Sequence, residues 1–233
     1  MNVEDISKDV VPTPTKEKDM LDLIFERQHS LAIKYLPVEK ENGLLQTEIF
    51  PGDLDDRFSQ ARMKDFAWRV QEELYEALEA LVIHKDNMVH FVEEMIDAVH
   101  FYVELCLFCG YDTKTIKEFY AIPDDVDKFE FIAGLAKRVD EQSGNMDKAI
   151  PTALLVSATI GQGIGNAMNK LKNKPWKQTH MVTDKEAFKI NLLSSWLGFF
   201  RVLCNKYDLK AEDIFTCYFK KSEVNNFRIA SKY

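Results

Sequence analysis

The chain has 233 residues, of which 46% are hydrophobic and 29% are charged, and its formal net charge is −8 at pH 7. A chain of this length and composition can bury the core of a globular protein. The acidic balance argues against a protein that coats nucleic acid and against a basic protein of the membrane surface, because both need positive charge to meet phosphates.

The first residues of the chain are polar and include Pro12 and Pro14. They lack the apolar segment of a signal peptide, and we find no apolar run as long as a membrane span. We therefore predict a flexible arm over residues 1–16 and a single domain over residues 17–233. The predicted location is the reducing cytoplasm, with no membrane or nucleic-acid partner.

Apolar residues recur at helical spacing along most of the remaining chain, and strand-like alternation is scarce. One of Asp53, Asp55 and Asp56 is expected to cap the second helix, and Thr183-x-x-Glu186 has the pattern of a capping box. The predicted fold is all-α, a helical bundle. Helices are predicted over residues 18–36, 57–83, 92–108, 112–122, 127–141, 148–172, 183–207 and 210–227, with a connection over 37–56 and a tail over 228–233.

The segment 92–108 is almost wholly apolar, yet it carries a narrow line of polar side chains. Asp97, His100 and Glu104 are spaced i, i+3 and i+7, so they share one stripe of the helix. This stripe is either the one face that meets water or the wall of an internal site that requires negative charge.

Two pairs of carboxylates lie in mirror register about a helix-breaking segment. The helix over 57–83 contains Glu73 and Glu76, the next helix contains Glu94 and Asp97, and both cross-pairs are centred on Lys85. An antiparallel hairpin that turns at Lys85 places Glu73 beside Asp97 and Glu76 beside Glu94. Four carboxylates in a bundle interior repel one another and lose hydration, and a bound Mg²⁺ or Mn²⁺ relieves both penalties.

Such a metal normally shares its ligands with water and substrate phosphates, which indicates a phosphoanhydride substrate. The alternative is that these acidic pairs face solvent or pair with basic side chains. The remaining carboxylates of the two helices are expected at the surface or around the site; they are Glu72, Glu79, Glu93 and Glu104.

Cys106 and Cys109 form a CxxC inside the apolar helix, and no second such pair is present. Packed free thiols are the better interpretation than a zinc site.

Two basic segments are candidates for binding phosphates. Lys221, Asn225 and Arg228 lie on one side of the last helix, and Lys177 lies in a lysine-rich segment around Trp176. The alternatives are a solvated basic helix end and a solvated loop.

The pattern EExxE followed by ExxD resembles the all-α nucleoside triphosphate pyrophosphatases, which include MazG proteins and dimeric dUTPases. The stretches EMIDAVHF (94–101) and YFKKSEVNNFRIASKY (218–233) are similar to motifs of the dimeric dUTPases and the related phage dCTP/dUTP pyrophosphatases. Ser222, Ile229 and Lys232 depart from that last motif. The motif places Lys221, Asn225, Arg228 and Tyr233 at matching spacings.

The resemblance implies a Mg²⁺-dependent homodimer that hydrolyses dUTP, with dUDP and dCTP as further substrates, to the monophosphate and pyrophosphate. It implies metal ligation and catalysis by Glu73, Glu76, Glu94 and Asp97, with Glu76 as the preferred general base. It implies substrate binding by Lys221, Asn225, Arg228 and Tyr233. It also implies Gln28 as a reader of the base and 121–183 as a variable helical insertion. His100 is either a core residue or a contact to the carboxylate or the sugar. Alternatives are an enzyme of the same fold for another dNTP, such as dCTP, dGTP or a modified nucleotide, and a non-enzymatic helical interaction protein.

Overall fold

The computed structural model describes residues 6–43, 50–83, 87–174 and 176–231. Regular structure in these ranges is helical, which confirms the predicted all-α bundle. A short 3₁₀ turn, Lys8–Val10, lies in the N-terminal segment. The α-helices are α1 (Met20–Glu41), α2 (Arg57–Val82), α3 (Met88–Phe108), α4 (Thr113–Tyr120), α5 (Lys128–Gln142), α6 (Thr152–Val156), α7 (Gln162–Lys170), α8 (Lys185–Leu193), α9 (Ser195–Phe200) and α10 (Ala211–Ser231).

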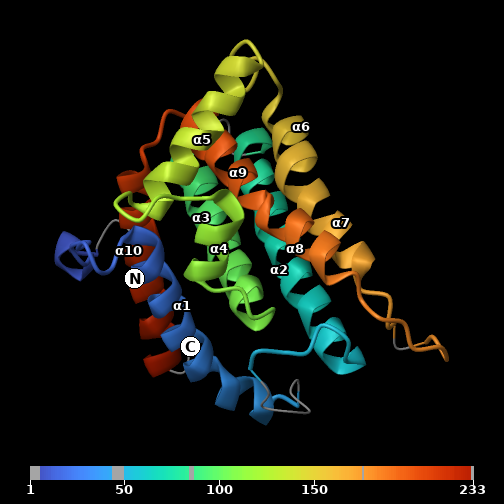
Figure 1. The fold of residues 1–233 in the computed structure, drawn as a ribbon. Helices are drawn as coiled ribbons and strands as arrows, with labels where there is room; N and C mark the ends of the chain where they lie inside the picture. The colour runs from blue at the N-terminus through green and yellow to red at the C-terminus, as the bar shows by residue number, and fades with distance from the viewer. Residues whose placement is uncertain (1–5, 44–49, 84–86, 175, 232–233) are drawn as a thin grey trace.

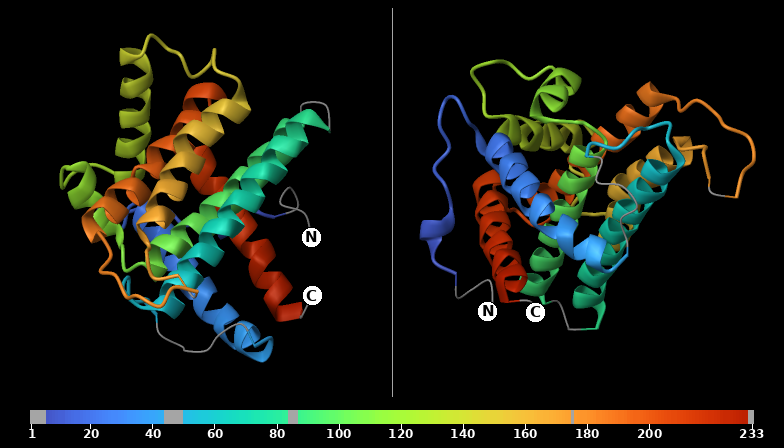
Figure 2. Two further views of the ribbon diagram at one scale, coloured as in Figure 1. Left: turned by 90° about the vertical axis from the view of Figure 1, so that its right-hand side faces the viewer. Right: turned by 90° about the horizontal axis from the view of Figure 1, so that it is seen from below.

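The helices pack around the hairpin of α2 and α3. On one side α1 and α10 contact each other and α3, and on the other side α7 lies between α2 and α8 (Figures 1 and 2). Most side chains of α3 lie inside the core of this arrangement. The apolar composition of the segment is therefore explained by burial on nearly all sides.

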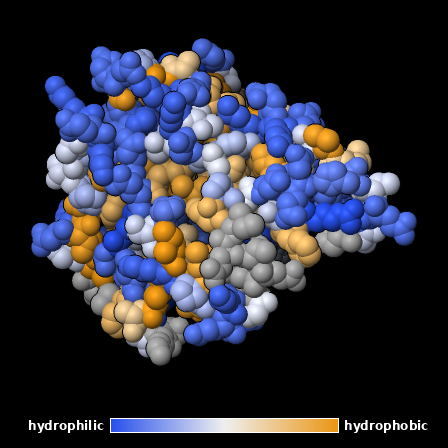
Figure 3. All heavy atoms as spheres, turned by 60° about the horizontal axis from the view of Figure 1, so that its bottom comes forward, coloured by the Kyte–Doolittle hydropathy of each residue, from blue (hydrophilic) through white to orange (hydrophobic). Residues whose placement is uncertain are grey.

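Aromatic side chains fill the centre of the core. Trp196 is 1% exposed and lies edge-on to Tyr102, with ring centroids 5.0 Å apart, and also edge-on to Phe129 at 6.0 Å. On the face drawn in Figure 3, polar side chains cover much of the surface and apolar ones emerge in separate patches.

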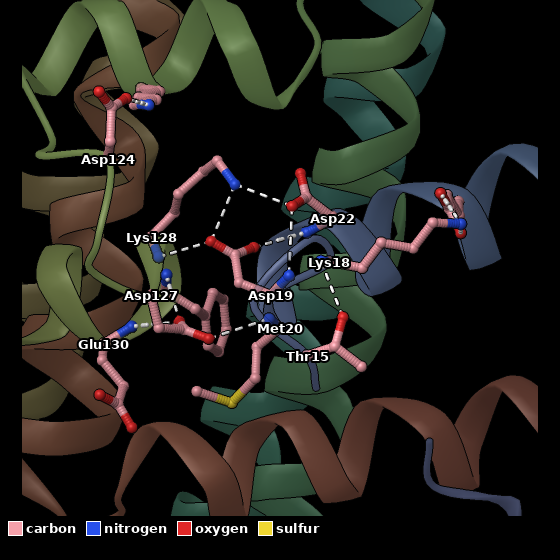
Figure 4. Close-up of polar contacts among 12 residues, drawn as sticks. Thr15, Lys18, Asp19, Met20, Asp22, Asp124, Asp127, Lys128 and Glu130 are labelled. Atoms are coloured by element: carbon pink, nitrogen blue, oxygen red, sulfur yellow. Dashed lines mark hydrogen bonds and ion pairs between the residues drawn. The ribbon is translucent and has the colours of Figure 1, made fainter. Parts of the chain in front are cut away.

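The helices α1 and α5 cap each other at their N-termini (Figure 4). Asp127 accepts a hydrogen bond from the backbone N–H of Met20 at 3.0 Å, and Asp19 accepts one from the backbone N–H of Lys128 at 2.8 Å. The Lys128 ammonium group also contacts Asp19 and Asp22, each at 2.8 Å. The N-cap side chain of each helix thus accepts a hydrogen bond from a backbone N–H in the first turn of the other helix, where the helix itself offers no acceptor.

Two helices extend beyond their predicted ends. α10 continues through residues predicted as a tail, and α1 continues through Pro37, where a connection was predicted. Pro37 removes one backbone hydrogen bond from the helix. The extension is held from outside, because Glu39 is buried and forms ion pairs with Arg62 and Arg69 of α2.

The structure differs from several predicted helix caps and helix lengths. Asp56 caps α2, as one of the three candidates. The expected capping box at Thr183 is wrong: Asp184 caps α8, because the buried Thr183 hydroxyl donates to the carbonyl of Leu54. The predicted helices over 148–172 and 183–207 are interrupted by π-helical turns, Ser157–Gly161 and Arg201–Lys206.

One helical stretch, Lys185–Lys206, is long and apolar enough to cross a membrane by length and composition. However, 56% of its apolar window is buried inside the protein, as expected for a helix that belongs to a core.

Candidate active site

Carboxylates from α2 and α3 meet at one point of the hairpin. One carboxylate oxygen from each of Glu73, Glu76 and Glu94 lies within 4.8 Å of the other two. Glu94 is buried, Glu73 is half-buried and Glu76 is exposed, so the cluster extends from the core to the surface. The approach of Glu76 to Glu94 agrees with the pairing expected for a hairpin centred on Lys85, although residues 84–86 themselves lie outside the described ranges. Asp97, the expected partner of Glu73, is not one of these three carboxylates, but its negative charge acts on Glu73.

The cluster resists full ionisation. Burial, together with the negative charges of Asp97, Glu94 and Glu76, raises the pKa of Glu73 to about 8. Burial also raises the pKa of Asp97 to about 6, even though the Lys221 ammonium group lies 2.7 Å from its Oδ2 and favours the carboxylate. A divalent cation with oxygen ligands would offset this accumulation of negative charge, so the donor set fits a hard metal ion.

A cavity of about 230 Å³ adjoins the carboxylates. Its floor and walls come from α1, α2, α3 and α10, and they combine apolar, acidic and basic side chains. The stripe of α3 therefore lines an internal site and does not face bulk solvent. The lining residues are Gln28, Leu31, Tyr35, Glu39, Arg69, Glu73, Asp97, His100, Phe101, Glu104, Asn225 and Arg228.

Gln28 is the centre of a buried hydrogen-bond network in the cavity wall. Its Oε1 accepts a hydrogen bond from the Tyr218 hydroxyl at 2.7 Å and lies 2.9 Å from His100 Nδ1. Its Nε2 donates to Glu104 Oε2 at 3.2 Å. Three helices thus fix the orientation of one side-chain amide, as expected for a group that binds a ligand in one defined pose.

His100 is held as a neutral ring. Burial and then the positive charge of Lys221 lower the pKa of His100 to about 3. The ring stacks on Tyr218 with centroids 3.9 Å apart. Its Nε2 is buried and has no hydrogen-bond partner among the residues described.

The C-terminal helix brings its polar face to the same cavity. Asn225 and Arg228 line the cavity, and Lys221 reaches Asp97. Ser222, which departs from the motif, is fully buried and accepts a hydrogen bond from Arg27 Nε at 2.6 Å. This bond joins α10 to α1 and thereby helps to place the basic residues.

Comparison with known protein families gives a match. A family model described as dUTPase covers residues 83–233, which is more than half of the chain and includes α3 to α10. The chain belongs to the dUTPase family. No curated protein and no solved structure matches.

Membership of the dUTPase family makes the chain a hydrolase of the nucleoside triphosphate pyrophosphatase type, with a nucleotide as its substrate. The match contains Glu94 and Asp97 but begins after Glu73 and Glu76. For the first pair, the structure shows only that Glu73 and Glu76 lie beside Glu94.

Two of the predicted substrate-binding residues, Lys177 and Lys221, do not line the cavity. Lys177 does not line it; its charge acts on Lys64, near the start of α2 and roughly 14 Å along the helix axis from Glu73. Tyr233 lies outside the described residues.

Sequence reasoning missed the part played by Glu104. It was expected at the surface or around the site, yet it is only 7% exposed and lines the cavity. Burial raises its pKa to about 7, while the charge of Arg69 acts in the opposite direction. The signal was present in the sequence, since Glu104 continues the stripe of Asp97 and His100 by one further turn.

The cysteines of the CxxC are buried free thiols, as predicted. Burial raises the pKa of Cys106 to about 12, so this thiol stays protonated and inert.

Proposed function

We propose that this member of the dUTPase family hydrolyses dUTP to dUMP and pyrophosphate in a reaction that depends on Mg²⁺ or Mn²⁺. The observation that carries the proposal is the convergence of Glu73, Glu76 and Glu94 beside a cavity of nucleoside size. dUDP and dCTP are proposed as further substrates, because each presents a similar sugar and phosphate group to the same site.

The metal ligands in this proposal are Glu73, Glu76, Glu94 and Asp97. Their oxygen donors suit a hard cation, and the raised pKa of Glu73 reflects its burial and then the repulsion from neighbouring carboxylates, which such a cation would offset. When bound, the ion supplies charge to orient the phosphates and to stabilise the transition state.

The chain's own residues supply the remaining chemistry. Glu76, the exposed carboxylate of the cluster, accepts a proton from water as the water oxygen bonds to the α-phosphorus. The bond from the α-phosphorus to the bridging oxygen breaks, and pyrophosphate leaves with that oxygen. Lys221 and Arg228 offset the negative charge on the phosphates.

The cavity beside the carboxylates holds the nucleoside in this proposal. Gln28 contacts the base, while His100 and Asn225 contact the nucleoside from α3 and α10. The enzyme is proposed to act in the cytoplasm as a homodimer. Lys177 and Tyr233 are proposed to bind the substrate phosphates as well.

The proposal is tested by incubating the pure protein with each dNTP in the presence of Mg²⁺ or EDTA and resolving the products. Mg²⁺-dependent formation of dUMP and pyrophosphate from dUTP is expected. If another dNTP is hydrolysed preferentially, the assignment of the site stands and the proposed substrate is wrong. No turnover of any nucleotide would overturn the proposal.

Point substitutions test the assigned metal ligands. Glu73→Gln and Asp97→Asn are each expected to reduce turnover by at least about 10²-fold while the helical circular-dichroism spectrum is unchanged. Glu79→Gln is the matched control, because Glu79 lies exposed on α2 and does not line the cavity. Full turnover in both variants would exclude the carboxylate site.

A further inference from the structure

Glu104 presents an unused hydrogen-bond acceptor in the cavity wall. Its Oε2 accepts from Gln28, whereas its Oε1 has no hydrogen-bond partner among the residues that the structure describes. A carboxylate at this depth loses hydration and is retained only at an energetic cost. A ligand N–H placed at Oε1 would lower this cost.

Gln28 presents an unused donor next to that acceptor. Both bonds to its Oε1 come from protein groups, the Tyr218 hydroxyl and His100 Nδ1. A carboxylate accepts and does not donate, so the nitrogen of the amide faces Glu104 and uses one of its two hydrogens there. The second hydrogen of Nε2 has no acceptor among the described residues.

Apolar and aromatic side chains adjoin this pair in the cavity wall. Leu31, Tyr35 and Phe101 provide apolar and aromatic surface, and the volume of about 230 Å³ is below the range typical of sites for larger organic ligands. Glu104 lies two helical turns from Asp97 on the same face of α3, or about 10 Å along the axis. This distance is comparable to the length of a nucleoside from the edge of its base to its 5′-phosphate.

We propose that Glu104 determines the choice of base: its Oε1 accepts the N3–H of a uracil ring, while the free N–H of Gln28 donates to an adjacent ring carbonyl. This inference rests on the proposed function. A cytosine ring in the same place turns the N3 lone pair toward the carboxylate and repels it. Thymine carries the same edge as uracil, so this pair does not separate those two bases.

The direct test measures binding of free nucleosides to the full-length, metal-free protein by ligand-observed NMR. The probes are 2′-deoxyuridine, 3-methyl-2′-deoxyuridine and 2′-deoxycytidine. Methylation of N3 and replacement by cytosine are each expected to weaken binding about tenfold or more, the effect of losing a hydrogen bond to a charged group. These comparisons use the wild-type protein and do not depend on a variant that folds.

Glu104→Gln then tests the residue itself, since glutamine keeps the volume and can donate to the cytosine N3. The preference for deoxyuridine over deoxycytidine is expected to fall to within about threefold. Glu79→Gln, on the exposed side of α2, should keep the wild-type preference.

Equal binding of the N3-methylated probe, or an unchanged preference in Glu104→Gln, would overturn the inference. Because no phosphate or metal takes part, these outcomes are independent of hydrolysis. If the protein hydrolyses dUTP but binds the N3-methylated probe equally well, the proposed function stands and the role of Glu104 in base recognition is wrong. If the protein distinguishes the nucleosides but hydrolyses no dNTP, the role of Glu104 in base recognition stands and the proposed function is wrong.

Discussion

Lys221 on α10 lies 2.7 Å from Asp97 on α3 and joins the basic helix to the carboxylate cluster. Burial by itself would lower the pKa of Lys221, but Asp97 and Glu94 outweigh burial and raise the pKa. The ammonium group therefore stays charged beside the carboxylates that are proposed to bind the metal ion.

Replacing Lys221 by methionine removes this cation and keeps most of the side-chain volume. We expect kcat for dUTP to fall about 10²-fold, as for the loss of one transition-state donor, and Lys221→Arg to restore part of it. Steady-state kinetics at saturating Mg²⁺ check the result. Lys220→Met is the matched control on the same helix, and an equal loss in both variants would show a general disturbance of α10.

Glu73→Gln is expected to stabilise the metal-free protein at alkaline pH. The pKa of Glu73 is about 8 in the folded state, above its ordinary value of 4.5, so the folded state holds the proton more tightly than the unfolded chain. The free energy of unfolding then falls as pH rises from about 4.5 through 8. Glutamine cannot ionise and avoids this loss.

The measurement is differential scanning calorimetry in EDTA at pH 5 and pH 8. After allowance for the partial solvent exposure of the site, we expect Glu73→Gln to raise Tm by about 2–4 °C at pH 8, equivalent to about 1 kcal/mol, and by less at pH 5. Added Mg²⁺ should stabilise the wild type more than the variant. A variant less stable than the wild type at pH 8 would contradict the repulsion inferred for the cluster.

Preference for dUTP over dCTP should increase with pH through about 7, the pKa to which burial raises Glu104. Above that pH the carboxylate accepts the uracil N3–H, and below it a protonated Glu104 donates instead. The ratio of the two kcat/KM values, measured from pH 6 to pH 8.5, cancels the ionisation of the metal ligands. The titratable and charged groups facing Glu104 are Tyr35 and Glu39 on α1, Arg62 and Arg69 on α2, Asp97 and His100 on α3, and Tyr218 and Arg228 on α10.

Glu104→Gln should give a ratio that is flat across this range. A ratio that changes with pH in both proteins would assign the effect to another of the groups around the cavity.

Asp127→Ala should lower stability without changing catalysis. Asp127 accepts backbone hydrogen bonds from Phe129 and Glu130 in its own helix and from Met20 at the start of α1 (Figure 4). Loss of this shared cap is expected to cost about 1–2 kcal/mol and to reduce Tm by several degrees, with kcat unchanged. Asp125→Ala, at an exposed position of the preceding loop, should leave Tm at the wild-type value.

The sequence alone determined the all-α fold and the register of Glu73, Glu76 and Glu94. Both follow from local periodicity: apolar spacing defines the helices, and equal distances from a helix-breaking segment define which residues of a hairpin face each other. It left open whether the stripe of Asp97, His100 and Glu104 faces water, because periodicity places residues on a face but does not say what covers that face.

The tertiary structure decided that question. α1 and α10, distant in the sequence, close over α3, so Gln28 and Tyr218 convert a line of polar residues into the wall of a cavity. It also extended α1 beyond Pro37, since Glu39 pairs with arginines of α2. These features depend on hydrogen bonds and ion pairs between separate helices, which no local pattern of the chain specifies.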